Sequence, residues 1–236
     1  VSWDLLYVVF MAIVLLLVAH AIVMAALAKK NLDRPTADGK KVVRHETVDR
    51  WFHWLMAASI LALIFTGISP ILGLRIAWLD LHWMSGLLLT FLVVAHIVRA
   101  SFWQDFKSML LVPKDFGEPF DSSRKPGKYY FEQKGMHWAV TVVTLAVIVT
   151  GVLMFMQIDT PFWDRTNSMA EDQLGLVFLL HGLSTLALVA LAATHIYFAL
   201  RPEKIYYTRS MISGWMSEDE LAANHDPALW SPKEAD

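Results

Sequence analysis

The residues of this sequence that could do chemistry are histidines in unusually apolar surroundings. Polar groups inside membrane-spanning segments are costly and usually functional. Imidazole is a strong axial ligand for haem iron, and it also binds zinc. Of nine histidines, seven lie within or at the mouth of long hydrophobic segments: His20, His53, His82, His96, His137, His181 and His195.

The spacing of these histidines indicates two levels along a helix. His82 and His96 are fourteen residues apart, and so are His181 and His195. Fourteen residues of α-helix advance about 21 Å and return to within roughly 40° of the same face. Each helix would present one imidazole near each side of a hydrocarbon core about 30 Å thick. Closed zinc sites want about four ligands at one point, so the pattern favours two stacked haems.

The composition places the elements that carry the histidines in a membrane. The chain has 236 residues, of which 56% are hydrophobic and 18% charged. A bilayer span needs about 20 mostly apolar residues. The expected fold is therefore all-α, an integral membrane bundle of five transmembrane helices. The expected spans are roughly 3–28, 51–72, 79–101, 136–158 and 174–200.

The positive charges predict the orientation of this bundle. Of the 20 Lys and Arg residues, seven lie at 29–50, seven at 99–135 and four at 201–236, whereas the other two loops hold only Arg75 and Arg165. Basic loops stay in the cytoplasm, so the N-terminus is expected outside and the C-terminus inside. The predicted organisation is an N-terminal anchor helix (1–28), a cytoplasmic basic loop (29–50), a four-helix di-haem core (51–200) and a cytoplasmic tail (201–236).

The first segment is expected to remain in the protein. It carries Asp4 near its start in place of basic residues, and it lacks a small-residue cleavage site. These features favour a retained anchor helix over a signal peptide.

Depth within the spans assigns only one pair of haem ligands. His82 and His181 are the two histidines near the outer face, so they are expected to hold the outer haem. The inner level holds more histidines than one haem needs, because His195 could pair with His53, His96 or His137. His20, at comparable depth, is expected to be a packing histidine, and His225 in the polar tail is expected to be solvated.

A repeat supports the haem interpretation without resolving the inner pair. His53-Trp54 is followed after eleven residues by Thr66-Gly67, and His137-Trp138 is followed after eleven by Thr150-Gly151. This pattern indicates a duplicated hairpin, so symmetry alone does not choose between His53 and His137. Gly67, Gly86, Gly151 and Gly182 would let a porphyrin approach a helix backbone, although small residues also serve helix packing in membranes.

Other classes of chemistry are excluded by what the sequence lacks. There is no cysteine, which excludes disulfides, thiolate metal sites, iron–sulfur clusters and the covalent attachment of c-type haem. No segment resembles a nucleic-acid footprint, a phosphate-binding glycine loop or a serine–histidine–aspartate set. The chain is therefore not expected to perform substrate chemistry alone.

Several motifs together resemble one known family. They are "RHETVDRWFHW" leading into "TGIS", "GKYYFEQK", "VTGVLMF", and "LLHG" followed fourteen residues later by "HIYFAL". They are similar to the gamma subunit of membrane-bound formate dehydrogenase, a di-haem cytochrome b family that includes thiosulfate reductase and nickel–iron hydrogenase membrane subunits. The resemblance covers about 44–215, so the first span is extra.

The resemblance implies particular site residues. It gives His53 and His195 to the inner haem and His82 and His181 to the outer one, leaving His96 and His137 as weaker candidates. It also implies a quinone region at the segment Lys128, Tyr129, Tyr130, Glu132 and Gln133, where Tyr130 and Glu132 replace the Asn and Gly of the family. Arg50, Arg99, Lys134 and Arg201 at the span mouths are candidates for haem propionates or plain interface anchors.

The function implied by the resemblance is electron transfer in a respiratory complex of the bacterial inner (cytoplasmic) membrane. Two b haems would connect a periplasmic iron–sulfur subunit, and a catalytic subunit with molybdenum, tungsten or nickel–iron, to the quinone pool. The chain would be the quinone-reactive subunit of that oxidoreductase. The alternatives are a stand-alone quinol-oxidising cytochrome of the b561 type and a haem-free scaffold or transporter. The substrate, the direction of electron flow and the quinone type are not encoded in these motifs.

Overall fold

The computed structural model describes residues 39–121 and 124–234, together with scattered residues between 5 and 23. Most of the expected first span, 3–28, and the loop residues 29–38 lie outside the described residues. The described residues between Leu5 and Val23 are helical.

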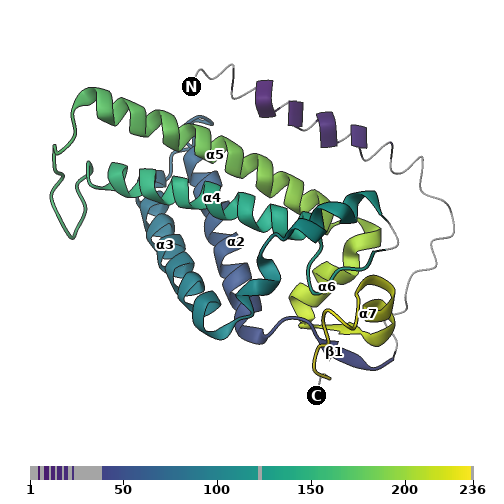
Figure 1. Cartoon of the computed structure of the whole chain (residues 1–236). Coiled ribbons are helices and arrows are strands. Elements are labelled where there is room, and N and C mark those ends of the chain that lie inside the picture. Colours follow the sequence, from purple (N-terminus) through teal and green to yellow (C-terminus); the bar gives the residue numbers. More distant parts are fainter. Residues whose placement is uncertain are drawn as a thin grey trace. The chain divides into compact units, whose positions relative to one another are not determined.

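Within the described residues, four helices are long and apolar enough to cross a membrane, as the sequence predicts for the last four spans. They are α2 (Thr47–Ile68), α3 (Trp78–Trp103), α4 (Phe131–Phe155) and α5 (Glu171–Ala199) (Figure 1). Many large apolar side chains on them are exposed, among them Phe65, Phe91 and Val149. A lipid-facing surface is apolar because hydrocarbon, unlike water, does not disfavour such side chains.

The helix ends differ from the predicted spans where polar residues extend a helix. Helix α4 begins at Phe131, five residues before the predicted start, and α2 begins at Thr47 instead of position 51. Their first turns carry Glu132 and Asp49, acids that the positive end of a helix dipole stabilises. The spans were predicted from runs of apolar residues. A polar first turn is not part of such a run, so the predicted helix starts too late in the sequence.

The chain divides into two compact units. One holds 55–95 and 139–193 with part of the N-terminal segment, and the other holds 39–54, 96–138 and 194–234. Below we call them the first unit and the second unit. Each unit contains a segment of all four long helices, and the second also contains the polar loops and the tail.

The tail of the second unit is folded. It forms η3 (Pro202–Lys204), α6 (Ile205–Ser213), β2 (Trp215–Ser217) and α7 (Glu218–Asn224). Strand β2 pairs antiparallel with β1 (Lys41–Val43), with Val42 opposite Met216 (Figure 1). Val42, Met216 and Tyr206 form a small buried core, against which Tyr207, Leu221 and Trp230 pack.

Local signals explain where the tail turns. Helix α6 ends at Gly214, whose φ of 93° is in the left-handed region that glycine adopts without strain. Ser217 then begins α7 with a capping box, because its hydroxyl accepts from the Glu220 amide while the Glu220 carboxylate accepts from the Ser217 amide. Arg209 forms an ion pair with the same carboxylate.

Candidate functional site

The first unit brings together the two histidines that depth had assigned to one haem. His82 of α3 and His181 of α5 face each other with ring centroids 6.4 Å apart and an interplanar angle of 69°. Both rings are partly buried. We call them the first histidine pair.

Each ring of the first pair is held by a threonine of the repeated Thr-Gly motif. Thr66 Oγ1 lies 2.9 Å from His82 Nδ1, and Thr150 Oγ1 lies 2.9 Å from His181 Nδ1. Each hydroxyl also donates to a carbonyl one helical turn earlier, at 2.7 Å. Because its proton is used there, the hydroxyl accepts from the histidine Nδ1–H. This fixes the tautomer and leaves Nε2 with a free lone pair.

The glycine of the same motif leaves room for the ring. A Cβ atom added at Gly67 would lie 3.6 Å from His82 Cε1, and one added at Gly151 would lie 3.4 Å from His181 Cε1. The two halves of the repeat therefore build the same small environment. The threonine role is one that sequence reasoning missed, although the Thr-Gly repeat was its visible signal.

The second unit holds two further histidine pairs. His53 of α2 and His195 of α5, the second pair, have ring centroids 6.1 Å apart. His96 of α3 and His137 of α4, the third pair, have centroids 6.4 Å apart. Of the three partners left open for His195, the structure therefore places His53 beside it.

The third pair has a different polar environment. Nδ1 of His96 is buried and has no hydrogen-bond partner among the described residues. Its ring also contacts Phe52, with centroids 6.1 Å apart. Outside these pairs, His20 approaches Tyr197, whose hydroxyl lies 2.7 Å from its Nδ1, as expected for a packing histidine.

The segment predicted to contact quinone is engaged with the tail. Tyr130 OH donates to the Asn224 carbonyl over 2.8 Å, and the Tyr130 amide donates to Gln133 Oε1 over 3.1 Å. Lys128 Nζ lies 5.3 Å from the centre of the Tyr129 ring. Burial raises the pKa of Tyr130, so its hydroxyl is a proton donor at neutral pH. Glu132 is exposed at the first turn of α4.

His225 is not solvated as expected, and this expectation was wrong. Its side chain is fully buried between the tail and the loop before α4. Nδ1 lies 2.6 Å from the Gly127 carbonyl and Nε2 lies 2.8 Å from Arg44 Nη1. A carbonyl accepts and a guanidinium donates, so His225 is neutral with its proton on Nδ1. The composition of the tail is polar, but this long-range contact is not visible in composition.

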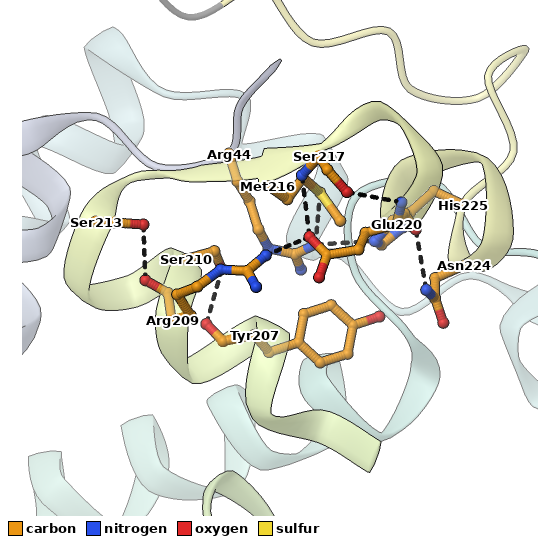
Figure 2. Close-up of polar contacts among 10 residues, drawn as sticks. All are labelled: Arg44, Tyr207, Arg209, Ser210, Ser213, Met216, Ser217, Glu220, Asn224 and His225. Atoms are coloured by element: carbon orange, nitrogen blue, oxygen red, sulfur yellow. Dashed lines mark hydrogen bonds and ion pairs between the residues drawn. The ribbon is translucent and has the colours of Figure 1, made fainter. Parts of the chain in front are cut away.

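Arg44 is the centre of this buried cluster (Figure 2). It is 3% exposed, and its Nη2 donates to the Lys128 carbonyl over 3.0 Å. The guanidinium carbon lies 4.4 Å from the centre of the Tyr207 ring, a favourable cation–π distance. Burial, and then the Arg44 charge, lower the pKa of His225 to about 4. The same two causes lower the pKa of His45 to about 2.

The basic residues at the helix mouths already have protein partners. Arg99 bonds Asp49 and Glu46 over 2.9 Å each, and Lys134 bonds the buried carboxylate of Asp115 over 2.8 Å. Arg50 donates to the Ile212 carbonyl and to Thr47 Oγ1, and the Arg201 guanidinium lies 5.8 Å from the Phe198 ring centre. Their contacts with haem propionates stay a prediction.

A family comparison decides the class of the protein. Residues 44–214 match the family model described as prokaryotic cytochrome b561. The chain belongs to this family. It is accordingly a multi-pass membrane protein of the b-type cytochromes, whose cofactor is haem b and whose task is electron transfer.

A curated relative agrees with this family. The chain is 24% identical over 205 residues to a protein of Haemophilus influenzae named formate dehydrogenase, cytochrome b556 subunit. The match covers 79% of this chain and 81% of the relative. The resemblance seen in the sequence motifs is thereby confirmed.

The ring separations in the three histidine pairs are compatible with a haem iron held between two imidazoles. Imidazole nitrogens bind transition metals at about 2 Å, and a ring centre lies roughly 1 Å behind the nitrogen, so two rings flanking a metal have centroids about 6 Å apart. The observed separations are 6.1 to 6.4 Å. No group of three or more His, Cys, Asp or Glu side chains that could hold a metal ion occurs among the described residues. The donor sets thus suit two-ligand haem better than a closed zinc site.

Proposed function

We propose that this cytochrome carries electrons through two b haems between a periplasmic iron–sulfur partner and the quinone pool. The first pair, His82 and His181, holds one haem, and the second pair, His53 and His195, holds the other. The observation that carries the proposal is the close approach of the rings in these two pairs, with centroids 6.4 Å and 6.1 Å apart. The shared family motifs favour the second pair over the third. Haem b supplies reversible one-electron transfer at each position.

The residues of the chain set the geometry and electronics of this path. Helix α5 supplies one ligand to each pair, His181 and His195, fourteen residues apart. Such a spacing corresponds to about 21 Å along a helix. Thr66 and Thr150 orient the first pair by accepting from Nδ1, and such support makes an imidazole a better metal donor.

The orientation of the path follows from the charges in the loops. The basic loops around 29–50 and 99–135 and the tail would lie in the cytoplasm. The second pair is then the inner one. A quinone would react near it at the segment Lys128–Gln133, where the Tyr130 hydroxyl is a protonated group of the predicted region. The expected membrane is the bacterial inner membrane, and the first span, 3–28, would be the fifth helix.

The partners follow from the curated relative and from the shared motifs. The relative is by name a subunit of formate dehydrogenase. This chain would accordingly assemble with an iron–sulfur subunit and a catalytic subunit that carries molybdenum, tungsten or nickel–iron. Affinity purification from mild detergent should recover such partners in fixed ratio. Active cytochrome recovered only as copies of itself would support the stand-alone quinol-oxidising alternative.

Haem stoichiometry tests the ligand assignment. The pyridine haemochrome assay on purified protein should give two b haems per chain. His53→Ala should lose one, because it removes a ligand of the second pair. His96→Ala and His137→Ala are matched controls, since they remove imidazoles from a pair with the same spacing, and they should keep two.

Other results would overturn specific parts of the proposal. One haem lost in His96→Ala or His137→Ala, with two retained in His53→Ala, would move the inner haem to the third pair. A third haem in the wild type would assign a cofactor to all three pairs. Folded protein without haem would rule out the relay altogether.

A further inference from the structure

A basic cleft lies in the second unit, between the loop that follows α3 and the tail. Its volume is about 570 Å³, which is in the range of small-molecule sites. The cleft lies on the polar segment that contains η1 (Phe106–Met109) and η2 (Pro113–Phe120). Six cationic side chains line it: Lys107, Lys114, Arg124, Lys125, Lys128 and Lys134.

Three of the four acids that line the cleft are engaged by the protein itself. Asp115 is 1% exposed, pairs with Lys134 and accepts from the Val112 amide over 2.9 Å. Glu118 accepts from the Phe131 amide over 2.8 Å. Asp226 accepts from the Ala228 amide. These contacts fix the loop but leave the carboxylates charged. With the exposed Asp105, four carboxylates line the cleft against six cationic side chains, so the lining carries a modest excess of positive charge.

Two lysines are available to a ligand. The side chains of Lys107 and Lys114 are exposed and form no hydrogen bond or ion pair with another described residue. Arg124 is paired with Asp121 over 3.1 Å, and Lys125 Nζ donates to the Ala222 carbonyl over 2.6 Å. The open positive groups thus come from η1 and η2.

The loop is held beside a membrane-spanning helix. Trp138 of α4 donates to the Met109 carbonyl over 2.9 Å, and its ring packs edge-on against Phe106. Trp138 is seven residues after the start of α4, which is about 10 Å along the helix. The loop is therefore at the level of the first turns of α4, where Trp side chains mark the membrane–water interface.

Large apolar side chains are exposed on the same two elements that carry these lysines. Phe106 of η1 is 43% exposed and Phe120 of η2 is 91% exposed. Exposed aromatic groups next to lysines are unfavourable in bulk water but suit the headgroup region of a bilayer. A quinone is uncharged and would not use the cations, whereas an anionic amphiphile satisfies both features.

We propose that this cleft binds the phosphate headgroup of an anionic phospholipid. Lys107 and Lys114 contact the phosphate, Arg124 and Lys125 complete the basic rim, and the exposed aromatic side chains lie among the acyl chains. Basic side chains at the membrane surface each add appreciably to the affinity for anionic lipid.

Native mass spectrometry of the delipidated full chain tests the proposal. Phosphatidylglycerol should bind at least roughly tenfold more tightly than phosphatidylcholine, and the double variant Lys107→Gln/Lys114→Gln should lose most of this preference. Lys40→Gln/Lys233→Gln removes two lysines that do not line the cleft, so it is the matched control and should keep the preference. The haem spectrum reports on folding in each variant.

Three results would overturn the assignment. Equal affinity for the two lipids would show that the charge of the headgroup does not determine binding. The same loss in the control variant would show a general surface effect. Displacement of phosphatidylglycerol by millimolar inorganic phosphate would show that the cleft binds a soluble anion, whereas failure to displace it supports a lipid.

Discussion

The threonines beside the first histidine pair show how one residue tunes a ligand. Thr66 and Thr150 each use their proton on a helix carbonyl and accept from Nδ1 of a histidine. Support at Nδ1 raises the basicity of Nε2, and a more basic axial ligand favours the oxidised iron. If the first pair holds a haem as proposed, the repeated Thr-Gly motif acts through its threonine as well as through its glycine.

Thr66→Val and Thr150→Val should each raise the midpoint potential of the haem held by the first pair and weaken its retention. Losing such support typically costs about 10- to 100-fold in metal affinity. Redox titration of the purified cytochrome measures the shift, and the other haem should not move. Thr144→Val is the control. Thr144 is buried on α4, the helix that carries Thr150, and its hydroxyl has no partner among the described residues. An equal shift in Thr144→Val would mean that packing, not the bond to histidine, is responsible.

Residue types and spacing reveal the histidines but only part of their pairing. The fourteen-residue intervals fix the level of His96 and His195, because axial rise depends only on residue number. They do not specify which neighbouring helix faces each ring. For this reason spacing and depth left His195 with three possible partners. The family resemblance favoured His53, and the structure places His53 beside His195 and His96 beside His137. The buried place of His225 was missed for a similar reason, since its partner Arg44 is 181 residues away.

At the scale of elements, a buried ion pair joins η2 to α4. Lys134→Met should destabilise the protein by about 3 kcal/mol or more, because it leaves the buried carboxylate of Asp115 without a cation. Adding Asp115→Asn should recover part of the loss, since the amide oxygen still accepts from Val112. Thermal unfolding in detergent gives both values. Lys114 is exposed on η2, so Lys114→Met should leave the stability unchanged. An equal loss of stability in Lys114→Met would refute the explanation.

The contact of α7 with the loop before α4 should weaken in acid. The folded state lowers the pKa of His225 from an ordinary value near 6.5 to about 4. Between these values the unfolded tail binds a proton that the folded tail does not. Stability is therefore present above pH 6.5 and is lost as the pH falls, by about 2 kcal/mol at pH 5.

Hydrogen exchange of the Met216 and Ser217 amides at pH 7 and pH 5 measures this loss. His225→Gln cannot titrate, so in that variant the change between the two pH values should be smaller. An undiminished change in His225→Gln would assign the acid response to other groups, of which His45 is the first candidate because burial and Arg44 also lower its pKa.

At the scale of the whole molecule, the absence of cysteine allows a direct test of orientation. Asp164→Cys and Lys233→Cys each introduce one thiol at an exposed position. A membrane-impermeant maleimide added to intact spheroplasts should label Asp164→Cys. It should label Lys233→Cys only after the membrane is disrupted. The reverse pattern would invert the predicted topology and place the second histidine pair at the outer face.

The general architecture could be predicted from the sequence because hydrophobicity alone specifies a membrane span. The last four spans agree with α2 to α5 to within five residues at each end. The folded tail could not be predicted in the same way. Strands β1 and β2 have three residues each, which is too short to show an alternation of apolar and polar side chains. Their pairing joins segments that lie before and after the four long helices in the sequence.

That pairing also has a consequence for biosynthesis. Arg44 leaves the ribosome 181 residues before His225, which at bacterial translation rates is about ten seconds or more. During this time the arginine lacks His225 and strand β1 lacks β2, while the four long helices are made and inserted. The sheet can close only when the tail arrives. A product truncated before β2 would therefore expose an unpaired strand that quality-control proteases could recognise.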